Sequence, residues 1–246
     1  MMRKFVDQAL FLAVFVLLWQ LLYVVSGEVA LSSPAATARR AAELLVSANF
    51  WPHVAETFRA LGYALAVALA GGLVMGLAAG LHRLSGEVVE PILIALYSLP
   101  KITLYPVILL VFGLGFSAKV AFGAIHGIVP VTLFAMNAVR NIQPVHFRTA
   151  RALGLSRREL LGSIVLPAAL PEIVSGVRIG FSLALLGVLI GEMFASQRGL
   201  GFITMKAIDL NDVETMMAIT LMLATVAVLP NAVLLALDRR LHHRAA

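Results

Sequence analysis

The sequence predicts an all-α polytopic membrane protein that folds as a single domain over residues 1–246. Apolar residues make up 61% of the chain and charged residues only 13%, whereas soluble domains are typically about 45–50% apolar and about 25% charged. So few charges cannot cover a soluble globule of this length, and the high hydrophobicity excludes a disordered chain. The apolar residues also gather in stretches long enough to cross the roughly 30 Å of bilayer hydrocarbon as helices.

Six such stretches predict six transmembrane helices. They lie at about residues 9–25, 60–81, 88–114, 118–139, 171–195 and 215–237. The first contains Trp19 and Gln20 and meets no small-residue cleavage site, so we interpret it as a retained helix rather than a signal peptide. The third contains Pro100 and Pro106, which predict either a simple kink or a helix that borders other protein or a transport path.

Lysine and arginine residues between the stretches predict the orientation. With the N-terminus in the cytoplasm, twelve basic residues fall on the cytoplasmic side and six outside, which favours cytoplasmic N- and C-termini. Residues 140–170 are then cytoplasmic, and residues 26–59 and 197–214 face outside. Ser33 and Pro34 predict the start of a short helix over about 35–47 that lies on the outer interface, where Arg39 and Arg40 form an unexpected basic pair.

Small residues recur at every fourth position in two of the stretches, which predicts close helix packing. They are Ala64, Ala68, Gly72, Gly76 and Gly80 in the second stretch, and Gly176, Gly180 and Ala184 followed by Gly187, Gly191 and Ala195 in the fifth. The pattern fits a contact within one chain and a contact between two chains equally well.

The charged segment 140–170 predicts two short helices joined by a sharp turn. Pro144 fits the first position of a helix that runs to about Leu153, and Gly154 fits the left-handed position after it. Ser156 and Glu159 have the spacing of a capping box at the start of a second short helix, which we expect Pro167 to stop after about residue 165.

The same segment resembles the "EAA" motif of permease subunits of binding-protein-dependent ABC importers. That motif reads Glu-Ala-Ala, three residues, Gly, nine residues, Ile, one residue, Leu-Pro. The sequence keeps its second Ala, its Gly, its Ile and its Leu-Pro, and it replaces the Glu and the first Ala with Arg148 and Thr149. The matching residues are Ala150, Gly154, Ile164, Leu166 and Pro167.

Four further pieces are similar to the nitrate, sulfonate and taurine branch of these permeases. They are Ser98-Leu99-Pro100-Lys101, Phe112-Gly113-Leu114-Gly115, the segment Leu166-Pro167-Ala168-Ala169-Leu170-Pro171, and Gly199-Leu200-Gly201-Phe202. The resemblance implies a type I importer permease of the inner membrane, which works as a homodimer with two ABC ATPase subunits and an extracytoplasmic substrate-binding protein. It also implies that segment 144–167 is a coupling helix, with its contacts carried by Arg148, Thr149, Ala150, Gly154, Ser156, Glu159, Ile164, Leu166 and Pro167.

The chain is not expected to be an enzyme or to bind a cofactor itself. A P-loop needs a glycine directly before a lysine, and none of the four lysines has one. ATP and magnesium therefore belong to the partner ATPase in this interpretation. No catalytic set or metal site is predicted, and His242-His243 is more typical of a solvated tail. Membrane lipid is an expected partner and nucleic acid is not.

Four residues within the predicted helices are candidates for a substrate path. Lys101 lies near the centre of the third stretch, where a cation either faces anionic cargo or pairs with Glu192 or a helix end. His126, Asn137 and Glu192 are the other candidates, although packing hydrogen bonds are the more common role for His126 and Asn137. By resemblance, Glu192 is a candidate for an outer gate.

Two alternatives to the importer permease stay open at this point. A secondary transporter or channel would work alone, and such proteins usually need acidic residues within the membrane for ion coupling, where this chain offers only Glu192 near one edge. A structural membrane adaptor would have no use for the broken third helix. The resemblance favours import of a small anionic solute of the nitrate, sulfonate or taurine kind.

Overall fold

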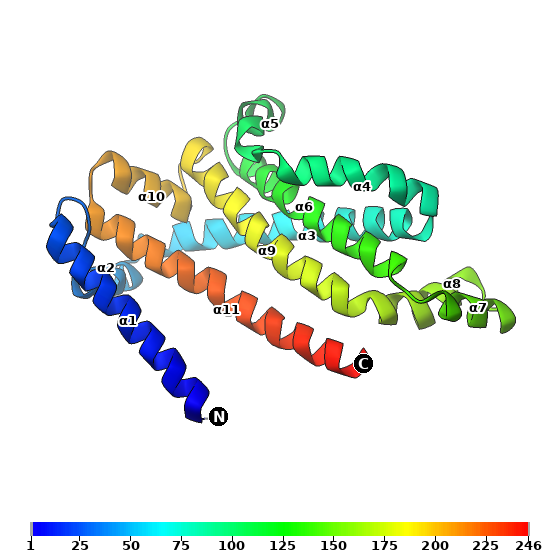
Figure 1. Cartoon of the computed structure of the whole chain (residues 1–246). Coiled ribbons are helices and arrows are strands. Elements are labelled where there is room, and N and C mark those ends of the chain that lie inside the picture. Colours follow the sequence, from blue (N-terminus) through cyan, green and yellow to red (C-terminus); the bar gives the residue numbers. More distant parts are fainter. Residues whose placement is uncertain (1, 246) are drawn as a thin grey trace.

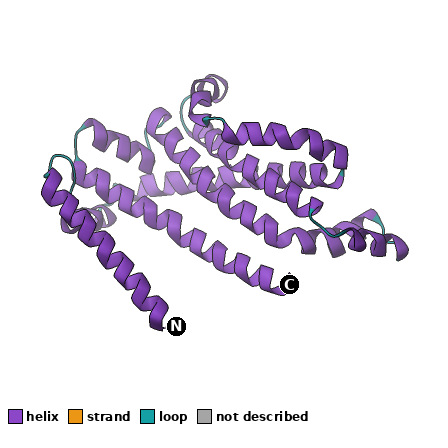
Figure 2. Ribbon diagram, in the orientation of Figure 1, coloured by secondary structure: helices purple, strands orange, loops and turns teal. Residues whose placement is uncertain are grey.

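The computed structural model consists of helices and short turns over the part of the chain that it describes (Figure 2). It describes the backbone of residues 2–245 and the side chains of residues 6–236, apart from residues 83, 157 and 195. The predicted solvated tail at His242-His243 therefore lies outside the described side chains.

Eleven α-helices and two shorter helical segments follow one another along this part of the chain. The elements are α1 (Met2–Ser26), α2 (Pro34–Val46), α3 (Trp51–Leu81), α4 (Arg83–Ser98), the 3₁₀ segment η1 (Lys101–Leu104), α5 (Tyr105–Phe112), α6 (Phe116–Arg140), α7 (Pro144–Ala152), α8 (Arg157–Leu160), the π-helical segment η2 (Leu161–Val165), α9 (Leu166–Ala195), α10 (Leu200–Asp209) and α11 (Val213–Ala245).

Five helices among the described residues are long and apolar enough to cross a membrane, and a sixth span results if α4 and η1–α5 are counted together. These two halves of the predicted third helix meet at an angle of 89°. The break falls at Leu99 and Pro100, whereas Pro106 lies in the first turn of α5, where a missing N–H is tolerated. The structure therefore contains a sharp break at Pro100, which is more than a simple kink.

Helix α6 forms the centre of the molecule, between α3 and α9 (Figure 1). Both stripes of small residues face it. A Cβ atom at Gly76 of α3 would lie 2.6 Å from the Thr132 carbonyl oxygen, and one at Gly187 of α9 would lie 2.8 Å from the Phe122 carbonyl oxygen. Both stripes therefore serve contacts within this chain, and at Gly76 and Gly187 only glycine lets the backbones come this close.

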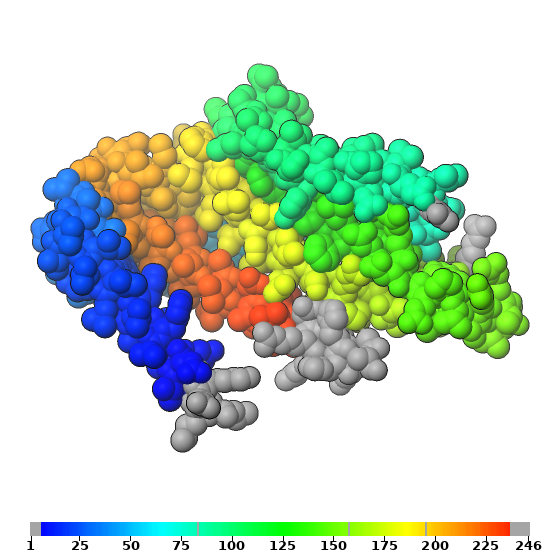
Figure 3. Space-filling view, in the orientation of Figure 1, coloured from blue at the N-terminus to red at the C-terminus, as the bar shows by residue number. Residues whose placement is uncertain are grey.

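The molecule has two distinct ends. Helices α7 and α8 project from one end, which we call the hairpin end, while α2, α10 and the turn before α11 lie at the other, which we call the distal end (Figures 1 and 3). Helix α1 contacts α2 but buries none of its apolar window against the rest of the chain. Its apolar surface is left for lipid or another subunit.

The predicted short helix at the distal end is confirmed as α2, with Ser33 as its N-cap and Pro34 in its first turn. Arg40 of α2 has partners at the start of α11. Its Nε donates to the Thr215 hydroxyl at 2.9 Å, and its guanidinium lies 3.9 Å from the Asp212 carboxylate. Partial burial raises the pKa of Asp212, but two hydrogen bonds from Thr215 and the Arg40 charge outweigh this and hold it below its usual range. The pair thus ties α2 to the start of α11.

Candidate functional site: the helical hairpin and the distal cluster

The hairpin is formed by α7 and α8, residues 144–160, and Gly154 makes its turn. Gly154 has a φ of 66°, as predicted. Its N–H donates to the Arg151 carbonyl at 3.1 Å, and the Leu155 N–H donates to the Ala150 carbonyl at 3.0 Å. This pair of bonds is a Schellman motif, which satisfies the last carbonyls of α7 and reverses the chain within three residues.

The predicted capping box at the start of α8 is also confirmed. The Glu159 N–H donates to the Ser156 hydroxyl at 3.3 Å, and the Ser156 N–H donates to the Glu159 carboxylate at 2.8 Å. Because each residue satisfies an N–H of the other, the turn has a fixed shape although it lies in water.

The prediction that Pro167 stops the second helix is wrong. Helical structure runs without a break from α8 through η2 into α9, and Pro167 lies in the first turn of α9. In the π-helical segment the Leu166 N–H bonds back to the Leu161 carbonyl, five residues earlier. This wider turn relieves the clash that a proline makes with the carbonyl four residues before it, and π-turns of this kind are frequent at functional sites.

The base of the hairpin is anchored in a small apolar cluster. Val139 and Ile142 from the end of α6 pack with Val165 before α9, and Phe147 of α7 and Leu160 of α8 pack against them. The base of the hairpin is therefore packed directly against the ends of α6 and α9.

The predicted coupling residues divide into an exposed and a buried set. Arg148, Thr149, Gly154, Ser156, Glu159, Leu166 and Pro167 are exposed. Ala150 is buried, and Ile164 is half-buried. The small size of Ala150 thus serves packing inside the hairpin, and the exposed residues form the surface that a partner would meet.

A second polar site, the distal cluster, surrounds Glu192 near the end of α9. The Glu192 side chain is fully buried. Its carboxylate accepts hydrogen bonds from the Thr57 hydroxyl of α3, with distances of 2.9 and 3.0 Å to its two oxygens, and from the Gly201 N–H of α10 at 3.0 Å. One carboxylate thereby joins three helices.

Lys119 supplies the positive charge of the distal cluster. Its side chain is 1% exposed, and its Nζ lies 2.9 Å from Glu56 and 3.8 Å from Glu192. The same Nζ donates to the Ser196 hydroxyl at 3.1 Å and to the Arg198 carbonyl at 3.2 Å. A buried cation is tolerated only with partners of this kind, and here they fix the turn between α9 and α10.

The turn itself approaches Glu192 closely at Gly199. This residue has a φ of 125°, and its N–H donates to Nδ1 of His53 at 3.1 Å. A Cβ atom at position 199 would overlap the Glu192 carboxyl group. The position therefore requires glycine for two reasons, its backbone conformation and the space that Glu192 occupies.

The four residues predicted to line a substrate path do not form one cluster. Glu192 belongs to the distal cluster. Lys101 lies at the break between α4 and α5, where its Nζ donates to the Tyr97 carbonyl at 3.2 Å and lies 5.3 Å from the centre of the Tyr97 ring. Of the two pairings considered for Lys101, the structure contains the one with a helix end.

His126 and Asn137 both lie on α6. Nδ1 of His126 is 2.8 Å from the Phe122 carbonyl oxygen in the preceding turn. Asn137 is half-buried three turns further along, towards the hairpin end.

Four residues of the distal cluster were not predicted from the sequence: Lys119, Glu56, Thr57 and His53. Lys119 was predicted only as one of the six outer basic residues, and residues 26–59 were predicted to lie outside the membrane, although α3 begins at Trp51. The available signal was a lysine placed four residues after Gly115, inside a predicted membrane helix. A charge at such a position normally has a buried partner.

These features define a class of protein: a multi-pass helical membrane protein with a rigid hairpin at one end and a buried ionic cluster at the other. The sequence profile of the family described as "Binding-protein-dependent transport system inner membrane component" matches residues 68–246. The chain belongs to this family, the multi-pass inner-membrane permeases of ABC importers.

Individual relatives agree with this assignment. The chain is 32% identical over 196 residues to the taurine transport system permease protein TauC of Escherichia coli (strain K12). This alignment covers 80% of this chain and 71% of the relative. It is 24% identical over 222 residues to the nitrate import permease protein NrtB of Synechococcus elongatus, covering 82% and 76%. Its fold is similar to a chain of the inward-facing MetNI methionine ABC transporter, with a TM-score of 0.62 at 18% identity, covering 78% of this chain and 93% of that chain.

Proposed function

We propose that this chain is the translocating subunit of an ATP-driven importer for a small anionic solute that a soluble binding protein delivers. ATP is hydrolysed in two separate ATPase subunits, and this chain binds no cofactor itself. A second copy of the chain completes the pathway. The observation that carries the proposal is the continuous helical connection from the hairpin through α9 to the distal cluster.

The hairpin has the properties that a coupling element needs. Its turn is fixed by the Schellman motif at Gly154 and by the capping box of Ser156 and Glu159. Its exposed residues outside the groove beside α7, including Thr149 and Ser156, are free to meet a groove of the ATPase. Because its base packs against the ends of α6 and α9, force applied to the hairpin passes directly into the two most closely packed helices of the bundle.

Helix α9 carries this force to the distal end. Its 30 residues span about 45 Å at 1.5 Å per residue, which is longer than the hydrocarbon thickness. Glu192 on this helix holds α3 and α10 together through Thr57 and Gly201. In the proposed cycle, ATP binding brings the two hairpins together, α9 tilts, and the distal cluster moves with it, so that the path opens to the outside.

The proposed orientation places the hairpin and both termini in the cytoplasm. The excess of basic residues on that side supports it. The distal end then faces the binding protein. The pairing of Arg40 with Asp212, together with Glu43 and Glu214 near Arg39 and Arg40, accounts for the one basic pair that this orientation puts outside.

The proposed cargo follows from charge and from the relatives. Lys101 adds a buried cation at the break between α4 and α5. A cation within the membrane favours an anion in the path. The relatives TauC and NrtB are named for taurine and nitrate, so we propose a sulfonate or a similarly small anion.

The distal cluster also weighs against a transporter that works alone by ion coupling. Such a mechanism needs an acidic group that exchanges a proton or a cation during the cycle. The carboxylate of Glu192 is instead engaged by Thr57, Gly201 and Lys119. This supports a structural or gating role for Glu192 within an ATP-driven cycle.

The experiment is co-purification followed by an ATPase assay. The chain is expressed together with its cognate ATPase and binding protein, and the complex is reconstituted in lipid nanodiscs. We expect an ATPase subunit to purify in equal amount and taurine or nitrate with the binding protein to stimulate hydrolysis. Purification of the chain without an ATPase, together with uptake driven by an ion gradient, would instead support the secondary transporter.

A further inference from the structure

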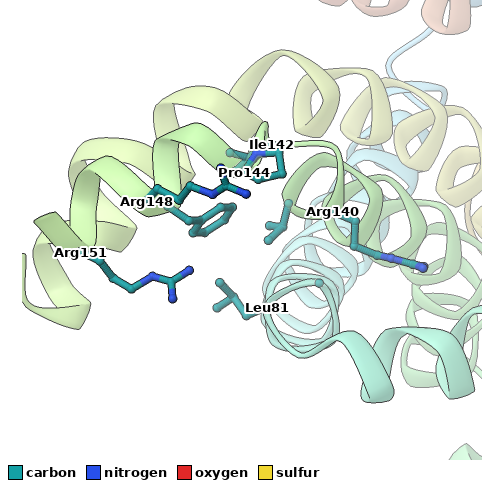
Figure 4. A pocket seen from close by; sticks show the side chains of 9 residues that line it. Leu81, Arg140, Ile142, Pro144, Arg148 and Arg151 are labelled. Atoms are coloured by element: carbon teal, nitrogen blue, oxygen red, sulfur yellow. The ribbon is translucent and has the colours of Figure 1, made fainter.

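A basic groove lies beside the hairpin, between α7 and the ends of α3 and α6. It has a volume of about 710 Å³ and is lined by Gly80, Leu81, Val139, Arg140, Ile142, Pro144, Phe147, Arg148 and Arg151 (Figure 4). This volume is in the range of sites for small ligands. The groove opens on the side of the hairpin that faces the membrane-spanning helices.

Two arginines in this groove have no partner within the part of the chain that the structure describes. Arg148 and Arg151 lie three residues apart on α7, so both fall on one face of the helix. Their side chains point from α7 towards the ends of α3 and α6, near Ile142 and Leu81 (Figure 4). Arg140 differs from them, because it already forms an ion pair with Glu90 of α4.

The remaining wall of the groove is apolar. Ile142 is buried, Phe147 is half-buried, and Leu81 at the end of α3 is 39% exposed. Two free guanidinium groups above an apolar floor match a ligand that carries an anion at one end and hydrocarbon at the other. A guanidinium also binds phosphate oxygens through two parallel hydrogen bonds.

The position of the groove agrees with such a ligand. Gly80 and Leu81 end the apolar span of α3, and Val139 and Arg140 end that of α6. The groove therefore lies where lipid headgroups meet the protein. Basic pockets at the cytoplasmic ends of membrane helices are known to hold anionic headgroups.

We propose that this groove binds the phosphate group of an anionic phospholipid, with Arg148 and Arg151 on the phosphate and an acyl chain beside Leu81 and Phe147. The bound lipid then contacts both the hairpin and the ends of α3 and α6, and so forms part of the connection between them. A phosphate of this kind could also come from solution, and the test separates the two sources.

Binding is measured on the purified full-length chain in detergent, without ATPase subunits, so that the result does not depend on the proposed coupling. Native mass spectrometry compares the retention of dioleoyl phosphatidylglycerol and dioleoyl phosphatidylcholine. We expect preferential retention of phosphatidylglycerol. Arg151→Gln should weaken its binding about fivefold and Arg148→Gln/Arg151→Gln about thirtyfold, because each arginine near an anionic headgroup contributes a factor of about five.

Arg158→Gln is the matched control, because Arg158 is an exposed arginine of the same segment that does not line the groove. Its phosphatidylglycerol binding should equal that of the unmodified chain. Equal retention of both lipids, or unchanged phosphatidylglycerol binding by the double variant, would overturn the proposal. Complete displacement of the lipid by millimolar inorganic phosphate would also overturn it, in favour of a site for free phosphate.

Adding the purified ATPase subunits gives a further outcome. Retention of phosphatidylglycerol in the assembled complex supports the proposal, because the lipid and the ATPase then occupy different sides of the hairpin. Release of the lipid on assembly would overturn the proposed role in this connection and assign the two arginines to acidic groups of the ATPase.

Discussion

The Glu192 carboxylate and the Lys119 ammonium group lie 3.8 Å apart, and both side chains are almost completely out of contact with water. They come from two helices, α9 and α6, that approach closely because Gly191 leaves no side chain between them. A Cβ atom at Gly191 would lie 2.8 Å from the Lys119 Cα atom. The small-residue stripe and the buried ion pair are therefore parts of one arrangement.

We expect Lys119→Met to lower the thermal stability of the purified chain strongly. The substitution removes the cation that contacts both Glu56 and Glu192, and breaking a buried ion pair by removing one partner costs about 3–5 kcal/mol. The measurement is thermal unfolding in detergent. Lys206→Met is the control, since Lys206 is exposed on α10. Equal melting temperatures for the two variants would contradict the proposed importance of the cluster.

Position 199 should tolerate no side chain. We expect Gly199→Ala to disturb the turn between α9 and α10, because the new Cβ atom would overlap the Glu192 carboxyl group. Gly115→Ala is the control, since Gly115 also has a positive φ, of 114°, but has open space around it. The melting temperature should fall more for Gly199→Ala than for Gly115→Ala. If both variants lose the same stability, backbone strain alone accounts for the effect.

Lys101→Met tests the proposed contact with cargo. If Lys101 binds an anion, uptake should fall through a KM raised about tenfold or more, as expected for the loss of a charged hydrogen bond. Assembly and basal ATPase activity should stay normal. Lys206→Met again serves as the control for loss of a positive charge. An unchanged KM, or loss of assembly, would leave Lys101 with only its bond to the Tyr97 carbonyl.

The orientation is testable because the chain contains no cysteine. A single cysteine at Ser47, after α2, should react with an impermeant reagent in intact cells, and one at Ser156 should react only after the cells are opened. The hairpin is exposed enough for labelling, since Ser156 lies on its surface. Labelling of position 156 in intact cells would reverse the proposed topology.

The hairpin could be predicted from the sequence because its geometry depends on neighbours in the chain. Gly154, Ser156 and Glu159 act on backbone groups within five residues, so their spacing is sufficient. The continuation of the helix past Pro167 could not be predicted in the same way. It depends on the π-turn at 161–165, which is stabilised by the packing of Val165 against α6.

The distal cluster was only partly predictable for a related reason. Glu192 stood out as an acid in an apolar stretch, but its partners Thr57, Gly201 and Lys119 come from three other helices. Charges along the sequence indicate which side of the membrane a segment faces. They do not indicate that Lys119 is buried, because burial follows from how α3, α6, α9 and α10 pack together.

Uptake by the reconstituted complex with Gly154→Arg tests the central claim most directly, which is that the hairpin couples an ATPase to translocation. Gly27→Arg is the matched control, because Gly27 also has a positive φ, of 78°, and open surroundings but lies at the distal end. We expect ATP-dependent uptake of taurine or nitrate by the unmodified chain and by Gly27→Arg, and none by Gly154→Arg despite normal membrane insertion. Uptake by Gly154→Arg at the rate of the control would contradict the account.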